Sequence, residues 1–491
     1  MAFLTAALLA SAVIQAAPAP VQETLAPADW RRIAQGDIAA AYDIYLSSHP
    51  GVVDPTNPSF PAQLKRARDK AMAFANQVED EAGYRRALAV FSAEMQDGHA
   101  QLWPVGKAAA ATLEWPGFVS AWRGDRLFVH RSEGSAIPRG SVIHSCDGRN
   151  AKALLNKYEF SWRGRPAEAG QWWSHGTHLF LREPSKYLRP IKSCRFRTPS
   201  GRIVSKKLQW TPAPPEAASW AAVAMEGEPS TIGFSEPRPG LFLISMPTFS
   251  PDKAGTEAYT ALFAAVDEHR ERITTARAVV IDLRHNKGGS SSYSRKLATQ
   301  LWGKPSVDAA AGNLFKDVEI WWRASPDNAR RHRNVAASLR RSNLEDRAVA
   351  TDRMAEKIEG ALARKETFHV DSLKKAEVPV PPPLPLPPVY VITDGSCFSA
   401  CLDAVDIFKR FSNVKLIGAP TSADSPYMET VGEKLPSGRA QAAIPTKIWM
   451  GKPRKNGEYY SPDLLFTALD WTLSGSLDAV ERDLRPAQLS R

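Results

Sequence analysis

Short apolar runs alternate with helical segments through the second half of the chain, and this alternation restricts the fold more than any other feature. Apolar strands are expected at residues 241–246, 278–283, 389–393 and 414–418. Helices are expected at about 254–270, from Tyr293, and at 399–411. Such alternation is typical of an α/β domain with a largely parallel sheet. We therefore predict an α/β domain over residues 231–491.

Further folded units are expected ahead of this domain, because a chain of 491 residues exceeds what one hydrophobic core supports. Apolar residues recur at helical spacing at Tyr84, Leu88, Phe91 and Met95. This spacing predicts a helical domain over residues 25–104. Its last helix is expected to stop at Gly98, since glycine often caps helices, and His99 would then lie just past the helix end.

Residues 105–215 have the pattern of a β-rich domain. Short apolar runs alternate there with turn pairs such as Asp147-Gly148. Residues 138–148 are similar to the strand and turn of a PDZ domain, a module that captures peptide carboxyl ends by strand addition. A generic β-hairpin is the alternative, because Asp-Gly turns occur in many β domains.

An insertion is expected inside the α/β domain at about residues 303–388. It contains a charged helical stretch at 334–368 and a proline-rich strap at 378–388. A segment of this kind is interpreted as a lid or a substrate gate, with an inert surface elaboration as the alternative.

Composition and charge exclude several classes of protein. Hydrophobic residues make up 43% and charged residues 23%, which excludes wholesale disorder and a polytopic membrane protein. The net charge of +11 is spread along the chain, so nucleic-acid binding is not implied. This charge is compatible with electrostatic association with an anionic envelope.

The N-terminal residues 1–17 carry no charged side chain and end in small residues. This pattern predicts a signal peptide, and an apolar N-terminal tail is the alternative. The run is short for a membrane span, and no later segment has about twenty uninterrupted apolar residues. We therefore expect an exported protein, periplasmic or secreted, without a transmembrane span.

Four cysteines fit two disulfides in an oxidising compartment. We favour pairing of Cys146 with Cys194. Cys397 and Cys401 lie four residues apart and could form a short bridge, although four reduced and buried thiols remain the alternative. No spacing typical of a zinc site is present, so no metal is expected.

Two segments carry the candidate chemistry. Residues 389–403 read as a buried strand, a tight turn and a helix, with Ser399 where helix N–H groups can stabilise an oxyanion. The alternative is that Ser399 or Ser396 is only a helix cap. Residues 278–289 are a strand that ends in a glycine pair, where backbone N–H groups can approach a ligand; a plain turn or a nucleotide loop is the alternative.

Taken together, the two segments resemble the catalytic domain of the tail-specific (carboxyl-terminal-processing) serine peptidases. This family has a crotonase-like or ClpP-like core and includes the tricorn protease. Further matching pieces lie at residues 97–99, 415–421, 435–439 and 461–463. The resemblance implies a multidomain α+β fold with a helical domain, a PDZ-like domain and an α/β catalytic domain. It also implies polypeptide substrates and no cofactor.

Carried over to this chain, the resemblance implies Ser399 as the nucleophile, with the N–H groups of Gly288 and Ala400 as the oxyanion hole. Many members use a lysine about twenty-five residues after the serine, and Asp424 stands at that place here. The sequence therefore argues against a Ser–Lys dyad and for a variant that lacks the catalytic lysine.

Tricorn-like members use a histidine from the helical domain, and His99 is the matching residue. A near-neutral pKa suits histidine to take the serine proton, although His99 could instead only pack at the helix end. His285 is the competing base. For the acid that orients the histidine, Glu458 is the candidate, because Asp97 lies too close to His99 along the chain for an obvious hydrogen bond.

The predicted function is an exported serine endopeptidase that cleaves unfolded or carboxyl-terminal peptide segments through an acyl-enzyme. The first alternative is a non-catalytic peptide- or lipid-binding homologue on the same fold. The second is a coenzyme-A-type acyl enzyme, since crotonase-like cores polarise thioester carbonyls with backbone N–H groups.

Overall fold

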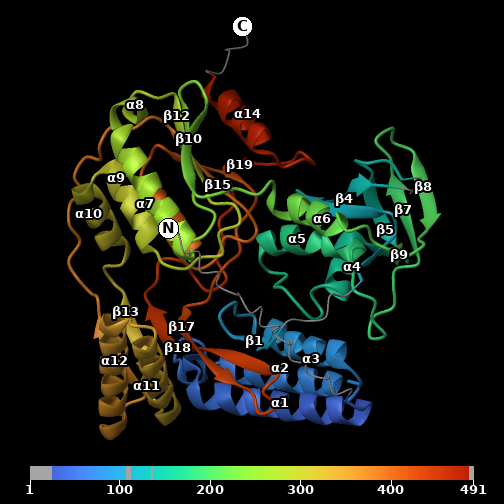
Figure 1. The fold of residues 1–491 in the computed structure, drawn as a ribbon, viewed down its shortest axis with the longest axis horizontal. Helices are drawn as coiled ribbons and strands as arrows, with labels where there is room; N and C mark the ends of the chain where they lie inside the picture. The colour runs from blue at the N-terminus through green and yellow to red at the C-terminus, as the bar shows by residue number, and fades with distance from the viewer. Residues whose placement is uncertain (1–24, 107–111, 134–136, 486–491) are drawn as a thin grey trace, which may run out of the picture.

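The structure is a computed structural model that describes residues 25–106, 112–133 and 137–485. The predicted signal peptide at residues 1–17 lies outside the described residues. Helices and strands occur together throughout, which confirms the prediction of a mixed α and β fold. Figure 1 shows three N-terminal helices at the bottom, the parallel-sheet part at the upper left and a β-rich part at the right.

The N-terminal part consists of α1 (Pro27–Ser48), α2 (Phe60–Ala75) and α3 (Glu81–Met95). Helix α3 is capped at its N-terminus by Asp80, whose side chain accepts a hydrogen bond from the Gly83 N–H. It ends before Gln96, which takes the left-handed conformation with a φ of 51°. The expected stop at Gly98 is thus two residues too late, and His99 lies in the loop that follows the helix.

These helices share a hydrophobic core with a β-sheet built from distant parts of the chain. The strand order is β1-β18-β13-β14, and β17 also pairs with β18. The strands are β1 (Gln101–Pro104), β13 (Glu319–Arg323), β14 (Phe368–Ser372), β17 (Tyr427–Lys434) and β18 (Ala440–Met450). Gln101 of β1 lies opposite Ala443 of β18. The helices pack on Tyr427 and Ile444 of this sheet, so they do not form a core of their own.

The β-rich part is an antiparallel sheet with the order β3-β4-β5-β7-β8, in which β6 also pairs with β5. Its strands are β3 (Phe118–Arg123), β4 (Arg126–Ser132), β5 (Val142–Cys146), β6 (Arg149–Asn150), β7 (Ser193–Arg197) and β8 (Ile203–Lys207). A short ribbon, β2 (Glu114–Trp115) with β9 (Thr211–Pro212), and the helices α4 (Ala151–Tyr158), α5 (Ala169–Gly176) and η2 (His178–Phe180) flank it. Cys146 and Cys194 face each other on β5 and β7 and form a disulfide.

The α/β part has the parallel sheet that the alternation predicts, in the order β10-β11-β12-β15-β16-β19. Its strands are β10 (Gly233–Arg238), β11 (Leu241–Ser245), β12 (Ala278–Asp282), β15 (Val389–Thr393), β16 (Val414–Gly418) and β19 (Leu464–Leu465). Only the pair β10 and β11 is antiparallel. Strands β11, β12 and β15 are buried along their whole length, which explains their continuous apolar sequences.

The two faces of this sheet are covered differently, because successive side chains of a strand point to opposite sides. Val279 and Val391 pack with the helices α7 (Lys253–Glu268), α8 (Arg270–Thr274), α9 (Ser292–Trp302), α10 (Lys304–Leu314) and α13 (Ala400–Phe408). Val280 and Tyr390 pack with the β-rich part and with α14 (Leu473–Leu484). The β-rich part and the parallel sheet therefore share one core. Helix α6 (Ala217–Glu226) joins them along the chain.

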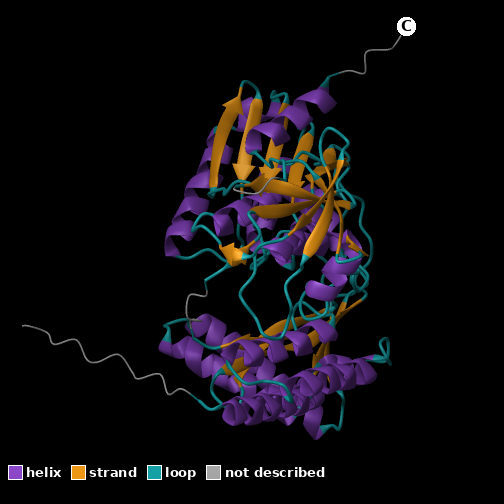
Figure 2. Ribbon diagram, turned by 90° about the vertical axis from the view of Figure 1, so that its right-hand side faces the viewer, coloured by secondary structure: helices purple, strands orange, loops and turns teal. Residues whose placement is uncertain are grey.

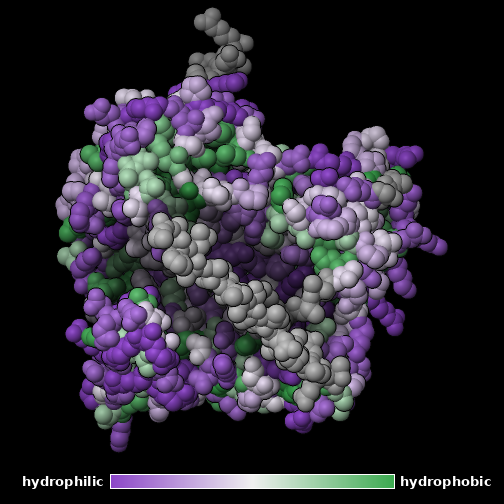
Figure 3. Space-filling view, viewed as in Figure 1, coloured by the Kyte–Doolittle hydropathy of each residue, from purple (hydrophilic) through white to green (hydrophobic). Residues whose placement is uncertain are grey.

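The predicted insertion is built into the molecule. It carries α10, then β13, the helices α11 (Pro326–Arg341) and α12 (Glu345–Ala363), β14 and a strap without regular structure. Because β13 pairs with both β14 and β18, the insertion completes the sheet under the N-terminal helices. Figure 2 shows these strands between the helical layer and the upper part of the molecule. At the lower left of Figure 3, the region of α11 and α12 has a mostly hydrophilic surface.

Within the described residues, no helix is long and apolar enough to cross a bilayer. The same part of the chain holds no group of three or more His, Cys, Asp or Glu residues arranged to bind a metal ion.

Candidate active site

Ser399 lies in the turn between β15 and α13, in a backbone conformation that non-glycine residues rarely adopt. Its φ is 56° and its ψ is −123°. Its side chain makes no capping hydrogen bond to α13, although its carbonyl accepts bonds from Leu402 and Asp403. Capping by the hydroxyl, the alternative for this serine, is therefore not seen. The half-buried hydroxyl is left for other contacts.

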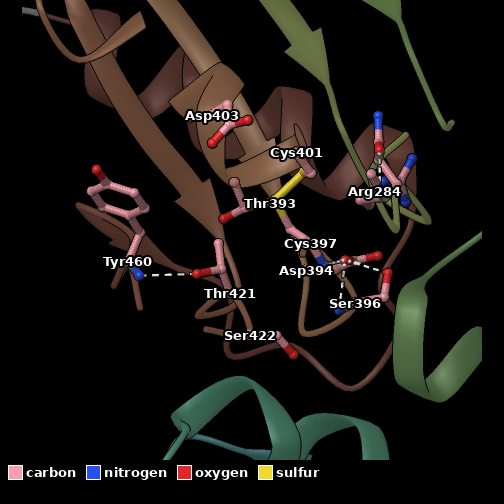
Figure 4. Close-up of a disulfide and its surroundings, with 12 residues drawn as sticks. Arg284, Thr393, Asp394, Ser396, Cys397, Cys401, Asp403, Thr421, Ser422 and Tyr460 are labelled. Carbon is pink, nitrogen blue, oxygen red and sulfur yellow. Dashed lines mark hydrogen bonds between the residues drawn. A yellow bond between two sulfur atoms is a disulfide. The ribbon is translucent and has the colours of Figure 1, made fainter. Parts of the chain in front are cut away.

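The turn before Ser399 is held by a buried carboxylate and a disulfide. One oxygen of Asp394 accepts hydrogen bonds from the Ser396 N–H and hydroxyl and from the Cys397 N–H. Burial and the nearby Glu226 raise the pKa of Asp394 to about 6. Figure 4 shows these bonds next to the disulfide that joins Cys397 to Cys401. The nucleophile candidate is thus the central residue of a five-residue disulfide loop.

His99 comes to Ser399 from a point 300 residues earlier in the chain, and its Nε2 lies 3.4 Å from the serine Oγ. The imidazole packs on Phe398, with ring centroids 4.6 Å apart. Burial lowers the pKa of His99, the positive charges of Lys452 and Arg165 act in the same direction, and Asp97 opposes them. The imidazole is therefore neutral near pH 7 and able to accept a proton.

Asp97 is the acid nearest to His99. Its Oδ1 accepts hydrogen bonds from the His99 N–H at 2.9 Å and from the Ser425 hydroxyl at 2.8 Å. The same oxygen lies 3.9 Å from Nδ1 of His99. On the far side, Nε2 of the fully buried His49 lies 3.6 Å from Oδ2. Asp97 thus holds the backbone of His99 directly and its ring through a longer contact.

Glu458, the acid predicted to orient His99, lies elsewhere. It is exposed and accepts a hydrogen bond from the Lys455 N–H at 2.7 Å. None of the described contacts joins it to His99. The position of Glu458 in the sequence could not show this, because the side chain folds back onto the backbone of the loop after β18.

Gly288 packs directly against the Ser399 turn. A Cβ on this glycine would lie 2.7 Å from the Phe398 carbonyl oxygen and 2.9 Å from the Ser399 Cβ, and its φ is 94°. Only glycine fits this approach. Its N–H donates to Oδ1 of Asn286 at 2.9 Å, so it is already engaged. Among the described residues, the N–H of Ala400, the first of α13, has no acceptor.

His285, the competing base, points away from Ser399. Its Nδ1 lies 3.1 Å from a Glu226 oxygen and its Nε2 lies 3.0 Å from the Glu228 carbonyl. Burial opposes protonation, but these contacts raise the pKa of His285. Its N–H donates to Asp394 at 2.6 Å, which ties the glycine loop to the serine turn. His285 therefore shapes the loop.

Asp424, at the place of the missing lysine, is buried in a charge network that the sequence did not reveal. Nζ of Lys452 lies 2.7 Å from it and Nη2 of Arg454 lies 3.1 Å away. Arg454 also pairs with Asp403 and Asp406. Burial raises the pKa of Asp424 to about 6 against the effect of Lys452. A lysine therefore stands near His99 after all, supplied by the loop after β18.

Residues 241–439, which include Ser399 and Gly288, match the family model described as Peptidase family S41. The chain is a serine-type peptidase. A search of curated protein sequences finds no match to this peptidase.

Solved structures place the peptidase in a known fold. Mature CPAF aligns with it at a TM-score of 0.56 and 14% identity, over 92% of this chain and 96% of CPAF. A complex of mature CPAF with lactacystin aligns at a TM-score of 0.55 and 14% identity, over 92% and 98% of the two chains. At this identity the likeness concerns the fold. His99 and Asp97 of the peptidase lie outside the family match, so their roles rest on geometry.

Proposed function

We propose that this peptidase is an endopeptidase in which Ser399 is the nucleophile and His99 the general base. The observation that carries the proposal is the 3.4 Å approach of His99 Nε2 to the Ser399 Oγ. A base within hydrogen-bond reach of a serine is the arrangement that acyl transfer requires. The chain thus fits the histidine-containing variant of its family that lacks the lysine after the serine.

In the proposed reaction, Nε2 of His99 takes the proton of the Ser399 hydroxyl while Oγ attacks the carbonyl carbon of the scissile bond. The imidazolium then gives that proton to the leaving amine, and an acyl-enzyme forms. In the second half of the reaction, His99 takes a proton from a water molecule, whose oxygen attacks the acyl carbonyl carbon. The bond to the Ser399 Oγ breaks, His99 returns the proton to Oγ, and the carboxylic acid product leaves. For Nε2 to accept, the proton of the neutral ring must sit on Nδ1, the nitrogen nearer to Asp97.

Asp97 is the proposed third member, in place of Glu458. As a buried carboxylate it stabilises the imidazolium that forms during proton transfer. Nδ1 of His49 accepts a hydrogen bond from the Gly51 N–H at 3.0 Å, so a neutral His49 carries its proton on Nε2, toward Asp97. His49 and Ser425 then hold the carboxylate from two sides.

The N–H of Ala400 is the proposed first donor of the oxyanion hole. It opens α13, whose N-terminus favours negative charge. Gly288 is the proposed second donor. Its N–H would exchange the Asn286 side chain for the oxyanion when substrate binds. Such tightening of catalytic hydrogen bonds on substrate binding is common.

Unfolded or carboxyl-terminal polypeptide segments are the proposed substrates, and an exported location is proposed with them. Two disulfides support an oxidising compartment. In the PDZ-like interpretation the β-rich part would hold the peptide by strand addition, and the alternating exposure of the edge strand β8 is compatible with this.

The test is labelling of the purified protein with a fluorophosphonate probe, followed by mass spectrometry of the modified peptide. We expect labelling of Ser399 that is lost in Ser399→Ala and falls at least about a hundredfold in His99→Ala. Ser396→Ala is the matched control and should still label. An unlabelled but folded wild type would favour the non-catalytic binding protein.

A further inference from the structure

A cavity of about 510 Å³ lies where three parts of the molecule meet, and Ser399 is not among its lining residues. Its walls come from α3, from residues 158–191 of the β-rich part and from α6. Volumes of this size are typical of small-molecule sites. None of the residues assigned to catalysis above lines it, so it is a separate site.

Positive charge is in excess around this cavity. Its charged lining residues are Arg85, Arg86, Arg163, Arg182, Glu159 and Glu183. Arg85 is paired with Glu81, and Arg163 with the buried Glu159. Of the two lining acids, Glu159 is therefore already occupied by Arg163.

In the described structure, the two remaining arginines have no carboxylate within hydrogen-bond distance. Among the described residues Arg86 forms no ion pair, and its guanidinium stacks on Trp162, 4.6 Å from the ring centroid. Arg182 lies 3.9 Å from Glu114, and its buried Nε has no hydrogen-bond acceptor in the described structure. Burial lowers the pKa of Arg86 to about 10, attraction to Glu159 opposes this shift, and repulsion from Arg163 and Arg182 adds to it. An anion in the cavity would offset the cost of burying these two positive charges and would reduce the repulsion between the arginines.

Most of the remaining wall is apolar, with polar atoms from Tyr158, Thr177, His178 and Ser185 between the apolar side chains. It includes Leu113, Leu179, Leu181, Ile191, Trp210 and Met225. His178 adds no charge, because burial and Arg163 lower its pKa to about 3. A ligand that satisfies this lining needs one anionic group and a body without hydrogen-bonding groups, since polar atoms against these side chains would lose their water partners.

We infer that this cavity binds a single-chain carboxylate amphiphile, such as a free fatty acid, with its head group at Arg86 and Arg182. A guanidinium matches a planar carboxylate with two parallel hydrogen bonds. The hydrocarbon chain takes the apolar wall. A peptide chain fits less well, because its backbone amides would be buried without partners.

The cavity is connected to the active site through two helices that line it. Helix α3 leads directly into Asp97 and His99, whereas α6 ends at Glu226, which holds His285 in the glycine loop. A ligand between α3 and α6 contacts both supports of the proposed catalytic site. Binding therefore alters the reactivity of Ser399.

The binding test uses full-length Ser399→Ala protein, so that its outcome does not depend on the proposed chemistry. Sodium dodecanoate, below its micellar concentration, is titrated calorimetrically, with dodecanol and a dodecyl trimethylammonium salt as uncharged and cationic controls. We expect one saturable site for dodecanoate and binding at least about tenfold weaker for both controls. Equal binding of dodecanol, or no saturable binding of dodecanoate, overturns the inference.

Variants locate the site. Arg86→Gln should weaken dodecanoate binding at least about tenfold, and Ala222→Trp should block it by filling the cavity from an exposed position of α6. Arg66→Gln, an exposed arginine on α2, is the matched control and should bind as before. Unchanged binding by folded Arg86→Gln overturns the assignment. The assignment is also overturned if the protein binds a peptide with a free carboxyl end but does not bind dodecanoate.

Coupling is tested on the wild type, and this readout rests on the proposed role of Ser399. Saturating dodecanoate should change the rate of fluorophosphonate labelling at least about twofold. Arg86→Gln should remove the change while it keeps the basal rate. An unchanged rate at saturation contradicts the coupling and leaves the calorimetric result to decide the site.

Discussion

Burial and a few charged side chains together determine the protonation state of the proposed base, His99. His99 and Lys452 are brought together although they lie in different parts of the sequence, and the pKa of His99 falls mainly through burial, with help from Lys452. A depressed pKa keeps the imidazole neutral, and therefore able to act as a base, to lower pH than an ordinary histidine.

The labelling rate of Ser399 should therefore rise with pH through a midpoint below 6.5 and stay level above it. Lys452→Met removes a positive charge near His99, so the midpoint should move to higher pH while the level rate stays within about threefold. Lys455→Met, an exposed lysine of the same loop, should change neither. A loss of about a hundredfold in the level rate would make Lys452 the base and His99 a bystander.

Elements are positioned here by close backbone contact and by covalent links. The glycine loop after β12 touches the turn before α13, and the Cys397–Cys401 disulfide closes that turn. Both features lie at the carboxyl ends of parallel strands, where α/β sheets commonly place ligands.

Gly288→Ala should abolish labelling of Ser399, because a methyl group would meet the Phe398 carbonyl oxygen at 2.7 Å. Gly438→Ala is the control, since its φ of 71° imposes similar strain but nothing lies within 4 Å of the added carbon. Each variant should lose about 1–3 kcal/mol of stability from its positive φ, measured by urea unfolding. Full activity of Gly288→Ala would show that this contact is dispensable.

Removal of one disulfide should mainly affect stability, and removal of the other should mainly affect activity. Removal of Cys146–Cys194, which spans 48 residues, should cost about 4 kcal/mol in urea unfolding by loop entropy, with little change in labelling. Removal of Cys397–Cys401, which spans 4 residues, should cost only about 2 kcal/mol yet slow labelling at least about tenfold. Paired Cys→Ser variants make the comparison, and equal labelling in both would contradict it.

The strands around the site could be predicted because β12 and β15 are continuous apolar runs buried on both faces. The meeting of Ser399 and His99 was predicted only through resemblance. Other parts of the site left no periodic signal. Lys452 reaches Asp424 from a loop whose path depends on tertiary packing. His49 lies behind Asp97 through a contact between α1 and the loop after α3.

The whole molecule buries many neutral histidines, and this determines how it responds to acid. A depressed pKa is found for His49, His99, His130, His175, His178 and His332, with burial as the largest cause in each. The pKa of His285 is raised, as are those of Asp394 and Asp424. These three groups favour the folded state at low pH, but the six histidines with a lowered pKa outnumber them.

Stability should therefore fall as pH drops below 6.5, because the unfolded chain then binds more protons than the folded one. The slope is about 1.4 kcal/mol per pH unit for each extra proton, so the melting temperature should be clearly lower at about pH 5 than at about pH 7.5. His130→Leu should flatten this dependence, since the pKa of His130 is lowered to about 4. A melting temperature independent of pH would contradict the assignment of neutral histidines.

Because β1 pairs with β18, the proposed active site can form only after the chain has been made as far as β18. His99 stands two residues before β1, and β1 finds its neighbour only in residues 440–450. A chain that is terminated between Ser399 and that strand keeps the serine turn but loses the strand that aligns the segment carrying His99. Chains still being synthesised should therefore be harmless to the proteins around them.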